Sequence, residues 1–246
     1  MEQFVLVADV LGFSAIMRNV PGELRSKRLD DWLGAINRSI LPDQRRQVVS
    51  DTVFVTAATS EDGLRGLIQT ARHLLEQGVV NNLPIRGAIA RGDVDWQSDA
   101  LWGPGVVEAY SLGQSTEWLG VVLAESTEPI PDALFDRREL VTFPTPFKEG
   151  PVRMYANVRW AAPPASALAG LTTGGFLTDP KESLGWSWMR KLQFTSDFRL
   201  YLDLIDAAGM PCSGYTAVIG SHLQEKFMEV ALPLAQAEWA DWRRPD

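Results

Sequence analysis

Two aspartates have surroundings that suggest chemistry. Asp9 interrupts an apolar run from Phe4 to Leu11, and Asp51 follows Ser50 between two β-branched runs. A buried carboxylate without a partner is costly, so Asp9 must meet a cation or hydrogen-bond donors. Two carboxylates without a histidine form the hard oxygen site that suits Mg²⁺ or Mn²⁺, metals that commonly act on phosphates. Two simpler alternatives remain: Asp9 pairs with Arg86 or caps the following helix, and Asp51 is a turn residue.

Other familiar site chemistries lack their residues. The chain has no G-x-x-x-x-G-K-[ST] motif, and Gly103-Pro104-Gly105 lacks the third glycine of a dinucleotide fingerprint. His73 and His222 each stand without a second histidine at metal-ligand spacing, and Cys212 has no neighbouring base. The sequence therefore disfavours four kinds of site: a P-loop, a dinucleotide-binding site, a zinc-hydrolase site and a cysteine nucleophile.

Composition describes an ordinary globular chain with an acidic balance. The 246 residues are 46% hydrophobic and carry 31 acidic against 23 basic side chains, a net charge of −8. This charge disfavours nucleic acids and anionic membranes as partners. A single cysteine fits a reducing compartment, and the first residues show neither a signal peptide nor a membrane span. We expect a cytoplasmic protein that binds neither nucleic acid nor membrane.

The elements that must position the aspartates alternate between strand and helix patterns. If the expected hairpin pairs beside the first strand, its tip brings Asp51 near Asp9. Gly12 opens a helix whose free N–H groups would favour an anion. The order indicates an α+β fold. The expected strands are 4–11, the hairpin 46–57, 84–94, 120–124, 139–143 and 152–158, and the expected helices are 12–19, 23–40, 64–79 and 103–112.

A linker-like stretch at 161–167 divides the chain. We expect one domain over residues 1–160. We expect residues 161–246 to form a helical C-terminal extension, broken near 209–211 and ending in a helix that carries Trp239 and Trp242. An independent small domain is the alternative. We expect this extension to pack on the first domain or on a partner subunit.

Four segments in order give the chain a family resemblance over about residues 3 to 160. The segments are Ala8-Asp9-Val10-Leu11-Gly12-Phe13-Ser14, Ser50-Asp51-Thr52, Arg86-Gly87-Ala88-Ile89-Ala90-Arg91-Gly92-Asp93-Val94 and Trp102-Gly103-Pro104-Gly105-Val106-Val107-Glu108-Ala109. Together they resemble the catalytic domain of class III nucleotidyl cyclases.

The resemblance implies a ferredoxin-like, mainly antiparallel sheet flanked by helices, and a homodimer with active sites at its interface. It implies that Asp9, Asp51 and the Val10 carbonyl hold two divalent metal ions, Mn²⁺ or Mg²⁺. It also implies that the backbone from Leu11 to Ser14 (Leu11, Gly12, Phe13 and Ser14) holds the phosphates of a nucleoside triphosphate.

The sequence departs from the family pattern at residues that select the nucleotide base and at residues that stabilise the transition state. Gln47 replaces the purine-selecting lysine, and Ala100 or Leu101 stands where the purine-reading aspartate is expected. Val107 and Ser111 replace the asparagine and arginine of the transition state. Arg91 occupies a usually small position and is a candidate donor to a pyrimidine carbonyl or the α-phosphate. The further pocket candidates are Trp102 and Tyr110.

With these departures, the sequence pattern resembles that of the pyrimidine cyclases of bacterial Pycsar antiphage defence. That resemblance implies synthesis of cyclic UMP from UTP, or of cyclic CMP from CTP, and a separate effector protein that senses the product; analogy favours UTP. Two alternatives are a purine cyclase with an unusual pocket and a degenerate module that binds nucleotide without turnover.

Overall fold

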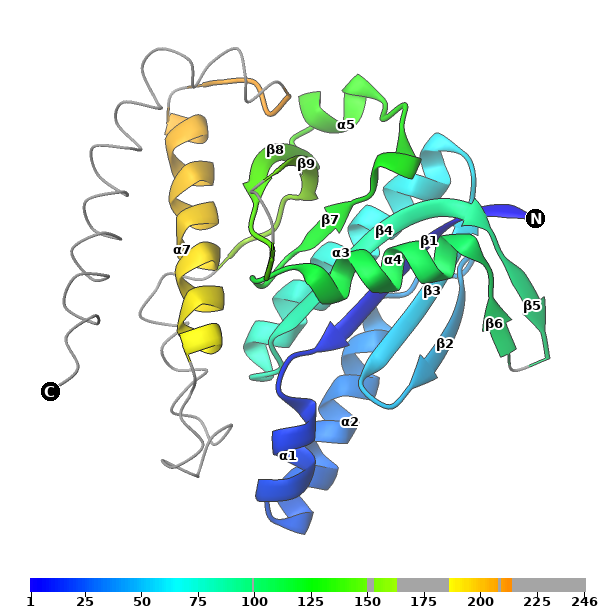
Figure 1. Cartoon of the computed structure of the whole chain (residues 1–246), viewed down its shortest axis with the longest axis vertical. Coiled ribbons are helices and arrows are strands. Elements are labelled where there is room, and N and C mark those ends of the chain that lie inside the picture. The colour runs from blue at the N-terminus through cyan, green and yellow to red at the C-terminus, as the bar shows by residue number, and fades with distance from the viewer. Residues whose placement is uncertain (99, 150–152, 163–185, 208, 214–246) are drawn as a thin grey trace, which may run out of the picture.

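The computed structural model describes residues 1–98, 100–149, 153–162, 186–207 and 209–213. Its centre is a seven-stranded sheet in the order β2-β3-β1-β4-β7-β9-β8 (Figure 1). Neighbouring strands are antiparallel except for β4 and β7. The strands are β1 (Glu2–Val10), β2 (Arg45–Val49), β3 (Thr52–Ala58), β4 (Ile85–Asp93), β7 (Val121–Leu123), β8 (Leu140–Thr145) and β9 (Arg153–Val158).

The first half of the chain forms a β-α-β-β-α-β unit. Helices α1 (Phe13–Asn19) and α2 (Gly22–Ser39) connect β1 to β2, and α3 (Glu61–Val80) connects β3 to β4. Each connection skips one strand of the β2-β3-β1-β4 order. This is the ferredoxin-like arrangement. The α+β fold with a mainly antiparallel sheet, expected from the sequence, is therefore confirmed.

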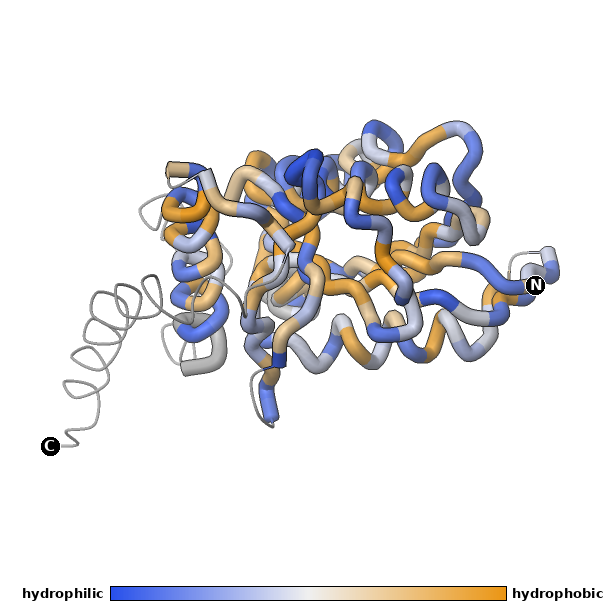
Figure 2. The backbone as a smooth tube through the Cα atoms, turned by 90° about the horizontal axis from the view of Figure 1, so that it is seen from above, coloured by the Kyte–Doolittle hydropathy of each residue, from blue (hydrophilic) through white to orange (hydrophobic). Residues whose placement is uncertain are grey.

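Alternation along β1 sorts its side chains between two layers. Phe4, Leu6 and Ala8 face the core formed with α2 and α3, whereas Val5 and Val7 face α4 (Pro104–Ser115). Figure 1 shows α4 on the opposite side of the sheet from α2 and α3. In Figure 2 the most hydrophobic backbone runs through the middle of the domain. Asp9, two residues beyond Val7, therefore lies on the α4 face.

Several elements differ from the sequence expectation or add to it. The expected hairpin is present as β2 and β3, and α4 continues to Ser115 beyond the expected end at Leu112. A small hairpin of β5 (Asp95–Gln97) and β6 (Ala100–Trp102), a short 3-10 turn at Glu125–Thr127 and α5 (Asp132–Asp136) were not expected. Three-residue strands and single turns are too short to produce a recognisable hydrophobic period.

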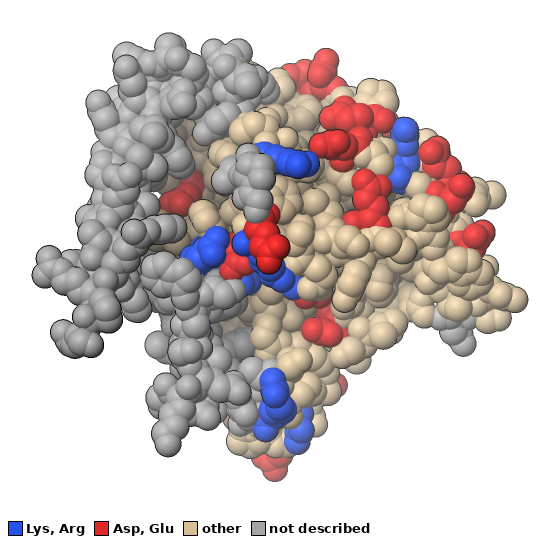
Figure 3. Space-filling view, in the orientation of Figure 1, with Lys and Arg blue, Asp and Glu red and all other residues tan. Residues whose placement is uncertain are grey.

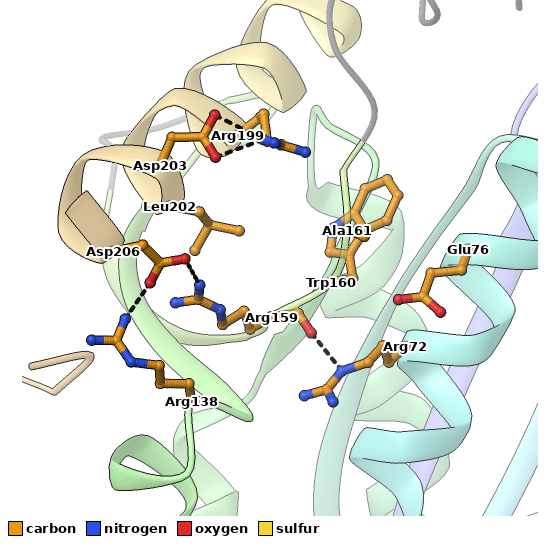
Figure 4. A pocket seen from close by; sticks show the side chains of 10 residues that line it. All are labelled: Arg72, Glu76, Arg138, Arg159, Trp160, Ala161, Arg199, Leu202, Asp203 and Asp206. Atoms are coloured by element: carbon orange, nitrogen blue, oxygen red, sulfur yellow. Dashed lines mark hydrogen bonds and ion pairs between the residues drawn. The ribbon is translucent and has the colours of Figure 1, made fainter. Parts of the chain in front are cut away.

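The described part of the C-terminal region is helix α7 (Trp186–Ala207), which lies beside β8 and β9 (Figure 1). Phe198 is fully buried against Trp118 and Phe143, at ring-centroid distances of 4.8 and 5.0 Å. Near the C-terminal end of the helix, Asp206 accepts hydrogen bonds from Arg138 and Arg159 (Figure 4). This part of the extension thus packs on the first domain. Trp239 and Trp242 lie outside the described residues.

Among the described helices, none has the length and apolar character needed to span a bilayer.

Glycines allow α4 to lie unusually close to the sheet. A Cβ on Gly92 of β4 would stand 2.8 Å from the nitrogen of Gly105, and one on Gly113 would stand 3.2 Å from the carbonyl carbon of Gly87. Backbone therefore meets backbone near both ends of the contact between α4 and β4. The glycines of the Arg86–Asp93 segment and of α4 fix this separation.

Gly92→Ala tests the close approach. Its new methyl meets backbone atoms that move only with α4, so we expect the free energy of unfolding to fall by about 1–3 kcal/mol, measured by urea titration. Gly34→Ala in α2 is the control, because there the methyl meets only the mobile end of Arg38, at 3.1 Å. Equal stability of the two variants would contradict the packing argument.

Candidate functional site

A buried ion pair lies at the end of β1. Asp9 stands opposite Arg86 in the β1–β4 register, and both residues are less than a tenth exposed. Arg86 Nε donates to Asp9 Oδ1 at 3.2 Å and Nη2 donates to Oδ2 at 3.5 Å. The pairing named as an alternative from the sequence is therefore present, and it supplies the counter-charge that a buried carboxylate needs.

Asp51 lies next to this pair. It directly precedes β3, where Thr52 stands opposite Asp9, and its carbonyl accepts a hydrogen bond from the Val10 amide at 3.2 Å. Ser50 takes a left-handed conformation with φ of 59° at the tip of the hairpin. The tight turn and the register thus bring the two aspartates together, as the hairpin pattern predicted.

Electrostatics at Asp51 disfavour its ionised form. Partial burial raises its pKa above the ordinary value of 3.8, and the negative charge of Asp9 raises it further, while hydrogen bonds and Arg86 act in the opposite direction. A cation bound between the two carboxylates would relieve both destabilising effects. Desolvation is the largest cause of the raised pKa, and the proximity of Asp9 adds to it.

The residues present fit a hard divalent ion. A carboxylate has about four lone-pair sites, so Asp9 can accept two guanidinium bonds and still coordinate a metal. The described residues contain no cluster of three or more acidic, histidine or cysteine side chains that would form an all-protein cage. Mg²⁺ usually binds through one or two carboxylates together with substrate phosphates, which matches this donor set.

The segment after β1 offers backbone donors, but fewer than the sequence suggested. The Leu11 amide donates to the Pro84 carbonyl at 2.8 Å and is therefore engaged within the sheet. Gly12 has a φ of 76°, which favours glycine, and lies exposed before the first turn of α1. The amides of Gly12, Phe13 and Ser14 stand where a helix provides no internal acceptors.

A row of side chains extends from the aspartates across the same sheet face. One row across β2, β3 and β1 consists of Val49, Thr52 and Asp9. Two residues further along each strand, and so on the same face, the next row consists of Gln47, Phe54 and Val7. Gln47 and Phe54 are half-buried, and α4 contacts β1 and β4. The part of this face formed by β2 and β3 thus lies beside α4 and next to the aspartates.

Trp102 and Tyr110 are both partly exposed. Each is 45% exposed, Trp102 on the small hairpin and Tyr110 on α4. Val107 is 64% exposed on the same helix, and Ser111 is also exposed. The helix contains no lysine or arginine. Any positive charge beside the aspartates therefore comes from elements other than α4.

Arg91 does not join the aspartates within one chain. It follows Arg86 by five residues on β4, roughly 17 Å along a strand, and an odd spacing places it on the opposite face of the sheet. Its Nε lies 3.7 Å from a carboxylate oxygen of Glu2, in a partly exposed ion pair. Its catalytic role stays a prediction.

Lys148 is a candidate anion-binding residue that the sequence patterns did not indicate. It lies exposed in the loop after β8, and its amide donates to the Ser115 carbonyl at 2.9 Å. Partial desolvation lowers its pKa, as do the positive charges of Arg86 and Lys191, while Glu117 and Asp9 raise it. This concentration of positive charge beside Asp9 could attract an anion. In the sequence Lys148 stands about 140 residues from Asp9, with no spacing that joins them.

No family model and no curated protein matches the chain. Among solved structures, a bacterial light-regulated adenylyl cyclase is similar at a TM-score of 0.47 and 14% identity, over 65% of this chain and 52% of the other. The guanylyl cyclase Cya2 gives a TM-score of 0.44 at 14% identity, over 64% and 91%.

An adenylate/guanylate cyclase/hydrolase from Silicibacter pomeroyi gives a TM-score of 0.44 at 18% identity, over 65% of this chain and 97% of that one. The chain spans about half the length of the light-regulated cyclase. A likeness at these scores does not establish an activity, which depends on the side chains of the site.

Asp51→Asn tests the metal site through stability. Because the folded-state pKa of Asp51 is raised, the folded protein keeps a proton that the unfolded chain has released above about pH 3.8. This residue therefore lowers the stability of the metal-free protein as the pH rises through the folded-state pKa. We expect the variant to lack that loss and to match or exceed the wild-type melting temperature at pH 7.

Mn²⁺ provides the second half of this test. It should raise the melting temperature of the wild type and not that of Asp51→Asn. Asp43→Asn, an exposed aspartate before β2, is the matched control and should respond like the wild type. Equal Mn²⁺ stabilisation of Asp51→Asn and the wild type would place the metal elsewhere.

Proposed function

We propose that the protein is a nucleotidyl cyclase that converts a nucleoside triphosphate into a 3′,5′-cyclic nucleotide and pyrophosphate. The observation that carries this proposal is the juxtaposition of Asp9 and Asp51 at the ends of neighbouring strands, with the raised pKa of Asp51. The motif resemblance assigns these two residues to the metals of class III cyclases.

The chain's own residues position and neutralise the substrate in this proposal. Asp9 and Asp51 hold the cations, and the amides of Gly12, Phe13 and Ser14 receive phosphate oxygens. When bound, two Mg²⁺ or Mn²⁺ ions supply charge neutralisation and lower the pKa of the ribose 3′-hydroxyl. As the ribose 3′-oxygen attacks the α-phosphorus, its proton would pass to a water molecule, and the bond between the α-phosphorus and the pyrophosphate oxygen would break in line, so that pyrophosphate leaves.

Lys148 supplies the positive charge that α4 lacks. It lies in the electrostatic field of Arg86 and Asp9, and no ion pair joins it to a carboxylate among the residues that the structure describes. Arg86 itself is committed to Asp9 and to the carbonyls of Gln114 and Thr116. We therefore assign Lys148 to the triphosphate.

The proposed substrate is a pyrimidine nucleotide, UTP rather than CTP. Gln47 lies half-buried on the same sheet face as Asp9, in the place of the family's purine-selecting lysine. An amide can both donate to and accept from a pyrimidine edge. The product would be cyclic UMP, read by a separate effector protein in antiphage defence. A cytidylate cyclase and a purine cyclase are the alternatives within this chemistry.

A second candidate function is nucleotide binding without turnover. Val107 and Ser111 replace the transition-state residues of the family and lie exposed on α4. In that case the metal and the nucleotide would bind but no cyclic product would form. Retention of both aspartates favours the enzyme.

We further propose a homodimer with its active sites at the interface. The surface over α4 carries few charged side chains (Figure 3), and Val107 and Tyr110 project from it. Exposed apolar and aromatic side chains together favour a protein interface. Trp102 stands 45% exposed near the same surface.

Direct assay of the four ribonucleoside triphosphates with Mn²⁺ tests the activity. We expect cyclic UMP as the main product, and background rates for Asp9→Ala and Asp51→Ala because each removes a metal ligand. Asp43→Asn should keep the wild-type rate. Lys148→Ala should raise KM, whereas Lys27→Ala, exposed on α2, should not. Nucleotide binding without any cyclic product would select the second candidate function, and turnover by either Ala variant would contradict the metal assignment.

Val107→Glu tests the interface. A buried, unpaired carboxylate is unfavourable in an apolar contact, so we expect the variant to sediment as a monomer at concentrations where the wild type forms a dimer. Glu108→Gln, a neighbouring change that adds no charge, is the control. A wild type that stays monomeric at all concentrations would contradict the proposed dimer.

A further inference from the structure

Helix α7 reaches the candidate site through a buried ion pair. Lys191 Nζ donates to Glu117 Oε1 at 2.7 Å, and the two side chains are 8% and 3% exposed. Replacement of such a pair by apolar residues is often neutral or stabilising, so the pair is weak evidence for a stabilising role. Its charge and its directed bond suit a role in holding geometry.

Glu117 belongs to a segment, residues 114–119, that α7 holds at three points. Besides the ion pair, Thr195 Oγ1 accepts a hydrogen bond from the Leu119 amide at 2.9 Å. Phe198 packs edge-on against Trp118 at 4.8 Å between ring centroids. Both contacts are buried.

The same segment holds Arg86. Arg86 Nη1 donates to the carbonyls of Gln114 and Thr116, each at 3.3 Å, and Nη2 donates to Gln114 Oε1. On its other side Arg86 binds Asp9 through Nε and Nη2. Contacts therefore run without a break from α7 to segment 114–119, to Arg86 and to Asp9.

We propose that Lys191 is a positioning residue for Asp9: its bond to Glu117 fixes segment 114–119, whose acceptors set the orientation of Arg86 against the carboxylate. The consequence for metal binding rests on the function proposed above, whereas the consequence for Arg86 does not. The C-terminal extension is thereby part of the site's architecture, and its docking controls the geometry of the metal carboxylate.

The test replaces both charges at once, because one charge left alone would stay buried without a partner. In Lys191→Met/Glu117→Leu the volume is nearly kept while the directed bond is lost. Arg86 Nε–H gives an amide-like proton resonance that reports its bond to Asp9. We expect this resonance to shift and its exchange with solvent to accelerate about tenfold or more. Thr195→Val removes only the hydroxyl that binds the Leu119 amide. We expect it to change the Arg86 resonance and its solvent exchange in the same direction, but less than the double variant does.

Asp206→Asn is the matched control. It loosens the opposite end of α7 at Arg138 and Arg159, far from segment 114–119, and should leave the Arg86 resonance unchanged (Figure 4). An unchanged resonance in the double variant and in Thr195→Val, or an equal change in Asp206→Asn, would overturn the proposal.

A second measurement separates this proposal from the proposed function. If the wild type binds Mn²⁺, we expect its Kd to rise about tenfold in the double variant and to stay constant in Asp206→Asn. If the wild type binds no Mn²⁺, the proposed metal site fails, and the Arg86 resonance alone still decides the positioning role.

Discussion

The ion pair of Asp9 and Arg86 is the constraint on which the rest of the site depends. A carboxylate at the end of an otherwise buried strand needs a counter-charge, and the β1–β4 register places Arg86 directly opposite it. Arg86 in turn needs acceptors for its remaining donors, and these come from the end of α4 and the residues after it. The separation of α4 from β4 is set by paired glycines. The sheet register thus determines which charges meet, and the packing of α4 determines where the remaining donors of Arg86 find acceptors.

The same pair leaves oxygen lone pairs of Asp9 available to a cation, because Arg86 occupies only part of the carboxylate. Beside it, partial burial and the nearby charge of Asp9 raise the pKa of Asp51. A cation between the two carboxylates would offset this cost of ionising Asp51. Lys148 adds an exposed positive charge near Arg86 and Asp9, so a polyanion held at the two aspartates through a cation would also meet a basic side chain.

Much of the frame could be predicted from the sequence, because long apolar runs and amphipathic helices have clear periods. The first strand, the 46–57 hairpin and the meeting of Asp9 with Asp51 follow from such patterns and from one turn. Lys148 could not be found this way, because it is brought to Arg86 by pairing between the loop after β8 and the end of α4. For Arg91 the alternation of side chains along β4 was decisive: counted from Arg86, it already places the two arginines on opposite faces. Leu11 illustrates a third limit, since only the structure shows that its amide bonds to Pro84.

In the function proposed above, Asp9 and Asp51 together bind the metal that activates a nucleoside triphosphate. The most direct measurement is anomalous diffraction at the manganese edge from crystals grown with Mn²⁺ and a non-cyclisable UTP analogue. We expect manganese peaks within coordination distance of both carboxylates, with the triphosphate beside Gly12–Ser14 and Lys148. Manganese bound elsewhere, or a nucleotide seated away from the two aspartates, would contradict it.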